Sequence, residues 1–338
     1  MMKKAALAWL ILLGAVAPVF AADHAVVFAY HRFGEDGVPA TNIRLAQFEA
    51  HLDHLEEGGF TVWPLSRIVK ALRDGTDLPD RTVALTADDA YRSVMTEAWP
   101  RLKQRGWTMT LFVATDGVDS GIRGYLNWDE IRRLKAEGME IGAHSAAHGH
   151  MAEMAVEEAR DDLERSRDRF RAELDAQPDL LVYPYGEYSA ALIDVARQVG
   201  YSAAFGQHSG ALSRSWNMFA LPRFAMNEAY GKIDRFRLAA SSLPLDVTDL
   251  EPADTVIRPG AYPRFGFRIL SDVRAKTLNC FHSSSGQKQT LSIDGAAVSF
   301  QPPGDARPGR SRYNCTAPAG QGRWYWHGRQ FVVPGGTD

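Results

Sequence analysis

Short apolar runs alternate with amphipathic stretches over the first two thirds of this chain. Seven runs predict β-strands, at residues 25–30, 60–63, 82–86, 109–113, 139–142, 180–183 and 202–205. Between them, Phe48, Leu52 and Leu55 recur at helical spacing, and the segments 128–134 and 154–174 read as further helices, the former capped by Asn127. Strands that alternate with helices predict a parallel sheet with helical crossovers. Seven strands over this length fit a (β/α) barrel better than a small open sheet.

The pattern changes after residue 243. Four prolines mark a linker-like stretch, at positions 244, 252, 259 and 263. Beyond it, alternating apolar and polar residues predict strands at 265–270, 290–293, 297–300 and 323–333. We therefore divide the chain into a leader (1–21), a barrel domain (22–245) and a small β-sandwich-like domain (246–338).

The first residues have the pattern of a secretory signal peptide. Lys3 and Lys4 precede an apolar run at 5–16, and small residues lead to an expected cut after Ala21. We expect the mature protein to be periplasmic or secreted, with no transmembrane segment after the leader is removed. An uncleaved anchor is the alternative interpretation.

Charge and cysteine content narrow the choice of partners. The formal net charge is −3, which gives no reason to expect nucleic acid as a partner. Both cysteines, Cys280 and Cys315, lie in the last quarter of the chain. In an exported protein such a pair indicates one disulfide, and two free thiols are the alternative.

The strongest chemical signal is a pair of aspartates followed by a pair of histidines. Asp88 and Asp89 come directly after a predicted strand, and His144 and His148 follow another. One carboxylate and two imidazoles suffice to hold a divalent ion, and the second carboxylate is left as a base. The histidine spacing is a weak signal by itself, and the aspartates alone would favour a surface turn or helix cap; the two motifs together favour the metal site.

His31 ends the first predicted strand. In a barrel this position faces the same opening as the other strand ends. An imidazole there could protonate a departing nitrogen near neutral pH, whereas the plainer interpretation is a polar loop residue.

Three motifs carry a resemblance to a known family. LTADDAYRS, GAHSAAH and YPYGEY, in this order, resemble the polysaccharide deacetylases of carbohydrate esterase family 4 over about residues 25–240. The resemblance implies a distorted or incomplete (β/α) barrel and hydrolysis of N-acetyl groups on glycans. It also implies that Asp88 is the base and that Asp89, His144 and His148 hold the metal.

The third motif implies a substrate groove formed by Tyr183, Pro184 and Tyr185, with the Tyr185 backbone N–H directed at an oxyanion. Val182 stands where the family usually has an arginine that orients the base, and Arg223 is a candidate to replace it. The YHRF run resembles a rearranged subgroup that includes periplasmic poly-N-acetylglucosamine deacetylases, which implies that His31 is the acid. His282 is its rival.

The resemblance implies one bound divalent cation and an N-acetylated glycan as partner. Zn²⁺ is the ion we expect, and Ni²⁺ or Co²⁺ would suit the same ligands. Two other functions remain open at this point: a non-catalytic glycan-binding or assembly protein, and an amidase of the same superfamily that acts on small molecules. The aromatic run 324–326 is either a sugar-stacking platform or part of the β core.

Overall fold

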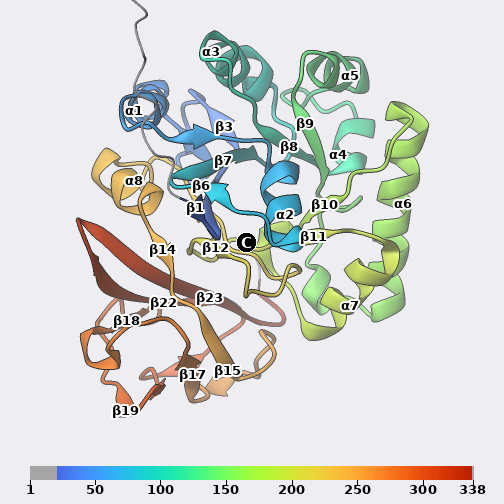
Figure 1. The fold of residues 1–338 in the computed structure, drawn as a ribbon. Coiled ribbons are helices and arrows are strands. Elements are labelled where there is room, and N and C mark those ends of the chain that lie inside the picture. The colour runs from blue at the N-terminus through green and yellow to red at the C-terminus, as the bar shows by residue number, and fades with distance from the viewer. Residues whose placement is uncertain (1–20, 337–338) are drawn as a thin grey trace, which may run out of the picture.

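The computed structural model describes residues 21–336. Its main sheet contains six adjacent parallel strands, in the order β11 (Ala203–Phe205), β10 (Leu180–Val182), β9 (Glu140–Ala143), β8 (Thr110–Val113), β7 (Thr82–Ala87) and β2 (His24–Tyr30). Three short strands extend it. β5 (Thr61–Val62) pairs in parallel with β7, β13 (Phe224–Ala225) pairs in parallel with β2, and β12 (Leu212–Ser213) pairs antiparallel with β2. The sheet curls without a continuous ring of strand pairing, as expected of an incomplete barrel (Figure 1).

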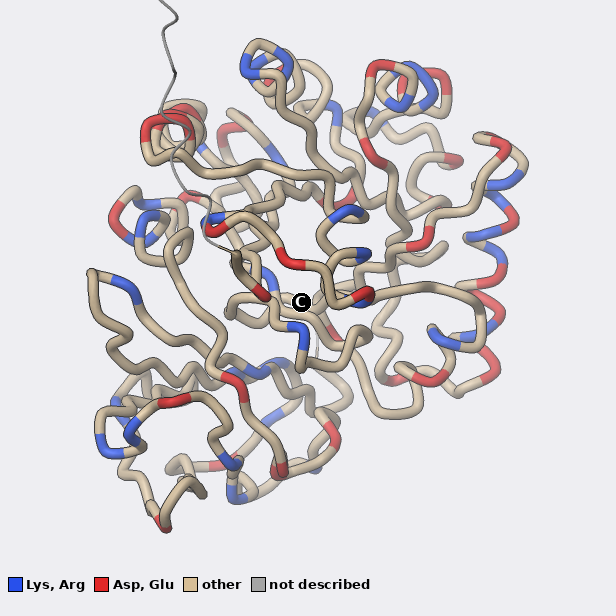
Figure 2. The backbone as a smooth tube through the Cα atoms, viewed as in Figure 1, with Lys and Arg blue, Asp and Glu red and all other residues tan. Residues whose placement is uncertain are grey.

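Helices surround this sheet (Figure 1). They are α1 (Leu45–Glu57), α2 (Leu65–Asp74), α3 (Trp99–Gln104), α4 (Thr115–Asp119), α5 (Trp128–Ala136), α6 (Val156–Leu174), α7 (Ala190–Val199) and α8 (Ile233–Ala240). The Asn127 side chain accepts a hydrogen bond from the Glu130 backbone N–H, which confirms the predicted cap of α5. Acidic and basic positions are interspersed along α6 (Figure 2), whose buried side includes Leu163 and Phe170.

The barrel strands are held from both faces. In β2, Val26 and Phe28 join one apolar cluster, whereas Val27 joins another that includes Leu65 and Leu72 of α2. Alternate side chains of a strand point to opposite faces, so helices on each side bury them. All six residues of β7 are buried. Strands fixed in this way hold their carboxyl ends in defined positions.

A second region is built from two four-stranded sheets. One has the order β14 (Leu243–Pro244), β23 (Arg323–Val333), β22 (Gly309–Gly320), β18 (Asn279–His282); the other has β15 (Val247–Glu251), β17 (Phe265–Ile269), β20 (Ala297–Phe300), β19 (Ser292–Asp294). A shared apolar core includes Phe265, Tyr313 and Phe331. The prediction of a linker after residue 243 is therefore partly wrong, because this stretch contains β15. The domain boundary at 245/246 stays a prediction.

The sequence did not indicate β22, although its burial alternates regularly. The inward positions include Ser311, Cys315 and Ala317, whose small or weakly apolar side chains hide the period-2 pattern. In Figure 1 the long β22–β23 hairpin (red) lies between the barrel and the rest of the β region. Arg323 of this hairpin donates to Asp80 at 3.0 Å and to the Ser241 carbonyl at 2.9 Å, which ties it to the barrel side.

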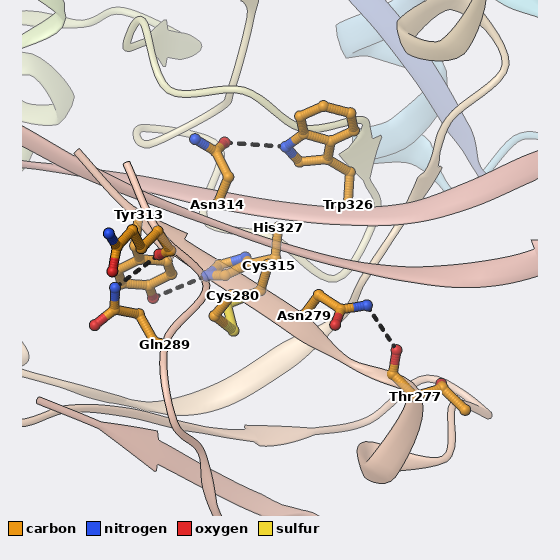
Figure 3. The surroundings of a disulfide bond; sticks show 10 residues. Thr277, Asn279, Cys280, Gln289, Tyr313, Asn314, Cys315, Trp326 and His327 are labelled. Carbon is orange, nitrogen blue, oxygen red and sulfur yellow. Dashed lines mark hydrogen bonds between the residues drawn. A yellow bond between two sulfur atoms is a disulfide. The ribbon is translucent and has the colours of Figure 1, made fainter. Parts of the chain in front are cut away.

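Cys280 of β18 and Cys315 of β22 form a disulfide inside this region (Figure 3). Both side chains are fully buried, and no free cysteine remains in the described chain. The bond closes a loop of 35 residues.

Replacing both cysteines by serine should lower the free energy of unfolding by about 4 kcal/mol, because the unfolded chain regains the entropy of that loop. Urea unfolding followed by tryptophan fluorescence measures the change, with the oxidised wild type as reference. A loss below about 1 kcal/mol would show that the loop constraint contributes little.

Residues 1–20 of the predicted leader (1–21) lie outside the described part of the chain. Among residues 21–336, no helix is both long enough and apolar enough to cross a membrane.

Candidate active site

The polar residues expected to carry chemistry follow four parallel strands of the barrel sheet, β2, β7, β9 and β10. His31 follows β2, Asp88 and Asp89 follow β7, His144 follows β9, and Tyr185 lies just after β10. The strands are parallel, so their carboxyl ends meet at one rim of the sheet. The fold thereby brings together residues that are up to about 150 positions apart.

Asp89, His144 and His148 form a compact cluster. One ligand atom from each lies within 4.8 Å of the others. Asp89 Oδ1 is 3.4 Å from His144 Nε2 and 3.2 Å from His148 Nε2. His144 Nδ1 lies 2.8 Å from the Val182 carbonyl, which can only accept, so Nδ1 carries the proton. In the neutral imidazole, Nε2 then directs a lone pair at Asp89.

This donor set fits a divalent cation. Asp89 Oδ1 is buried and has no hydrogen-bond partner among the described residues, although it faces two imidazole nitrogens. Asp89 Oδ1 and the His144 Nε2 lone pair are both electron donors, and a cation between them satisfies both. The His144 bond to a backbone carbonyl is also the outer contact that orients histidine ligands in metal sites.

Backbone strain concentrates at this cluster. Nine residues other than glycine have positive φ in the described chain, and five of them lie here: Asp89, Ala90, Ser145, His148 and Tyr185. Such conformations cost free energy and persist where surrounding contacts hold them. Asp162 of α6 supplies such contacts, because its carboxylate accepts the backbone N–H groups of the two alanines between His144 and His148.

Asp88 is held by a fully buried arginine. Its two carboxylate oxygens accept from Arg223 Nη1 and Nη2, both at 2.8 Å, and both side chains are 0% exposed. Burial alone would raise the pKa of the Asp88 carboxyl, but the charge and hydrogen bonds of Arg223 outweigh it and hold the pKa below its usual value. Arg223 also donates to Thr86 and to the Gly206 carbonyl, so the guanidinium has one orientation.

The two histidines weighed as the acid lie in different surroundings. His31 lines the groove, and its Nε2 is 3.8 Å from Asp88 Oδ2. His282 lies in the β region, 1% exposed, between the rings of Tyr262 and Phe265. Burial lowers the pKa of His282 to about 4. Of the two histidines, only His31 lies beside Asp88, and only His31 lines the groove.

The groove beside the cluster has a volume of about 730 Å³ and is lined by Asp89, His148 and Tyr185. The expectation that Tyr183 and Pro184 line it is wrong for their side chains. Both are buried, and the Tyr183 hydroxyl donates to the Phe219 carbonyl. These two residues instead support the turn that presents Tyr185.

Several groove residues were not indicated by the sequence pattern. They include Tyr91, Tyr125 and Tyr230 from the barrel region, and Arg310 and Arg312 from β22. Tyr91 stands two residues after Asp89, which is the only sequence signal among them. The others come from loops and from a strand that the sequence pattern did not indicate, so only the tertiary structure places them here.

Comparison with known proteins gives a family match and two relatives by sequence. Residues 75–204 match the polysaccharide deacetylase family. The Bacillus subtilis protein YxkH is 25% identical over 177 residues, covering 52% of this chain and 63% of the relative. The poly-β-1,6-N-acetyl-D-glucosamine N-deacetylase of Escherichia coli K12 is 23% identical over 223 residues, covering 54% of this chain and 33% of the relative. The chain thus spans between a third and two thirds of these relatives.

Solved structures share the fold. IcaB from Ammonifex degensii superposes with a TM-score of 0.59 at 22% identity, covering 65% of this chain and 97% of that one. The Streptococcus pyogenes deacetylase PplD gives 0.60 at 18% identity, covering 64% of this chain and 98% of that one. Residues 75–204 therefore match a polysaccharide deacetylase domain, and the solved structures show that the barrel shares their fold.

Proposed function

We propose that this chain is a metal-dependent hydrolase that removes acetyl groups from an N-acetylated, GlcNAc-type glycan. The observation that carries the proposal is the Asp89–His144–His148 cluster with the arginine-held Asp88 carboxylate next to it in sequence and in space. The glycan preference is supported by the name of the Escherichia coli relative, a poly-β-1,6-N-acetyl-D-glucosamine N-deacetylase.

Asp88, Tyr185 and His31 each have a separate role in the proposed reaction. Asp88, kept ionised by Arg223, takes a proton from the water that attacks the acetyl carbonyl. The Tyr185 backbone N–H donates to the oxygen that becomes negatively charged. His31 then protonates the amine nitrogen as its bond to the acetyl carbon breaks, so that acetate and the free amine leave.

Asp89, His144 and His148 would hold the cation. A divalent ion there supplies Lewis acidity to the carbonyl and lowers the pKa of water. We propose Zn²⁺, with Ni²⁺ or Co²⁺ as alternatives that the same ligands suit. We also propose, from the leader pattern in residues 1–21 alone, that the protein acts in the periplasm or outside the cell.

Acetate release from N-acetylated chito- and β-1,6-linked oligosaccharides, measured before and after chelation and metal return, tests the activity. Asp89→Ala should lower metal affinity by more than about 100-fold, since losing a direct ligand costs more than losing an outer partner. Asp116→Ala, a partly exposed aspartate of α4, is the matched control. Elemental analysis after dialysis measures the bound metal.

Two results would overturn this proposal. Full metal retention by Asp89→Ala would remove the cluster from metal binding. Glycan binding without acetate release by the metal-loaded wild type would favour the non-catalytic alternative.

The aromatic run 324–326 adds no sugar platform at Trp326. Its ring packs edge-on against Phe224, and its indole N–H donates to Asn314.

A further inference from the structure

Two arginines of β22 reach the groove from the β region. Arg310 and Arg312 are two positions apart on one strand, so their side chains leave the same face, while Ser311 and Tyr313 point to the core. Both arginines line the groove that also contains Asp89 and His148. The β region therefore contributes charge directly to the candidate active site.

The two arginines differ in their carboxylate contacts. Among the residues that the structure describes, Glu187 lies 3.8 Å from Arg310 and also pairs with His150 at 2.9 Å. Arg312 donates from Nε to Gln330 at 2.7 Å, and no carboxylate of the described residues lies within ion-pair distance of it. Its side chain is largely buried, and burial together with the charge of Arg310 lowers its pKa.

An arginine that loses hydration without gaining a carboxylate is a costly feature for folding alone. The cost is offset when a ligand brings an anionic group to the guanidinium. Gln330 holds the Arg312 guanidinium in place and also donates to the Tyr185 carbonyl at 3.0 Å, so the charge is fixed relative to the motif turn. Preorganised charge of this kind suits recognition of a defined substituent.

The charge also lies near the reacting position. The Tyr185 ring contacts the His148 ring, with 4.7 Å between the centroids. It also contacts the Arg310 guanidinium, which lies 5.2 Å from the Tyr185 ring centroid. One aromatic ring thus separates the basic wall from a candidate metal ligand. Four tyrosines, Tyr91, Tyr125, Tyr185 and Tyr230, line the same groove and offer surfaces on which sugar rings pack.

We propose that Arg310 and Arg312 form an anion subsite, which selects N-acetylated glycans carrying a carboxylate or phosphate on the reacting sugar or its neighbour. This inference rests on the proposed deacetylase function and narrows its substrate class. Asp89 is the only carboxylate among the groove-lining residues that the structure describes, and the cation would engage it. An anionic glycan therefore meets little repulsion, and guanidinium groups match both oxyanions by paired hydrogen bonds.

Three matched probes test the subsite: penta-N-acetylchitopentaose, the same oligomer with its 6-hydroxymethyl groups oxidised to carboxylates, and its 6-phosphorylated form. The wild type is compared with Arg310→Gln and Arg312→Gln. Arg268→Gln, an exposed arginine of β17 that does not line this groove, is the control. The kinetic constants are measured on the metal-loaded proteins, and binding is measured by calorimetry on metal-loaded proteins that also carry Asp88→Asn, which limits turnover of the probes.

The wild type should prefer an anionic oligomer over the neutral one. Arg312→Gln should lower kcat/KM for that oligomer by about 10- to 100-fold, mainly through KM, because charge-assisted hydrogen bonds are lost. Activity on the neutral oligomer should change less than about twofold, and the control should match the wild type. Preference for the carboxylated or the phosphorylated probe identifies which substituent the site takes.

Equal losses on neutral and anionic oligomers would assign Arg312 a structural role and overturn the subsite. A wild type without preference would overturn it as well, while acetate release from the neutral oligomer would leave the deacetylase proposal intact. Conversely, calorimetry that shows Arg312-dependent binding of an anionic oligomer, without acetate release from any probe, would support the subsite and reject the activity.

Discussion

Asp88→Asn should lower kcat/KM for acetate release by about 10³-fold while the protein retains its metal. The variant keeps the size of the side chain but removes the basic oxygen that takes the proton from water. Asp89, His144 and His148 are unchanged, so the candidate metal cluster stays complete. Acetate release and metal content, measured on the same preparation, separate loss of the base from loss of the cation.

The control for this variant is Asp116→Asn, at an aspartate whose side chain is 48% exposed and pairs with Arg165. It should have wild-type kinetics. Activity of Asp88→Asn within about tenfold of the wild type would place the base elsewhere. His31 would then be the first candidate, since its Nε2 lies 3.8 Å from Asp88 and its side chain reaches the groove.

Arg223→Met should lower the free energy of unfolding by about 3–5 kcal/mol, because it leaves the buried Asp88 carboxylate without its partner. Two hydrogen bonds of 2.8 Å are lost from a site with 0% exposure. Activity should fall as well, because burial without Arg223 raises the pKa of Asp88 and favours its protonated form. Denaturant unfolding of the metal-free protein measures the stability change.

The stability difference should depend on pH in a defined direction. The native pKa of Asp88 is lowered, so the stabilisation from the pair is present above the pKa of an unfolded aspartate and is lost as pH falls through the lowered native value. The gap between wild type and Arg223→Met should therefore be full at neutral pH and should narrow in acid. A gap that stays constant down to the acid limit would contradict the ion-pair explanation.

A surface pair with the same chemistry provides the control. Arg169 donates to both oxygens of Asp119 at 2.7 and 2.8 Å, but these side chains are 33% and 34% exposed. Arg169→Met should cost no more than about 1 kcal/mol. The double variant Asp88→Asn/Arg223→Met should be more stable than the sum of the two single changes predicts, since neither buried charge is then left alone.

The strand pattern of the barrel could be predicted from local sequence. The runs at 25–30, 82–86 and 109–113 correspond to β2, β7 and β8, because strands buried on both faces must be continuously apolar. The barrel class is confirmed by the structures that share it. β22 escaped prediction because its buried positions include serine, cysteine and alanine, which carry little periodic signal.

The candidate site divides in the same way. Asp88, Asp89, His144 and His148 stand at strand ends within two short motifs, so their residue types and positions were visible locally. Arg223 was only a candidate by its charge, since 135 residues separate it from Asp88. Arg310 and Arg312 had no signal, because a residue on a distant strand becomes part of a groove only when the β region packs on the barrel.

The sequence by itself determined the main strands of the barrel and the chemical groups at their ends, since both follow from burial and spacing over a few residues. Only the tertiary structure decided which arginine neutralises Asp88, that Tyr183 and Pro184 are buried, and that the β region supplies a basic wall. The interactions of charges and aromatic rings depend on their separation in the folded molecule. A local sequence pattern does not show which segments more than a hundred residues apart come into contact.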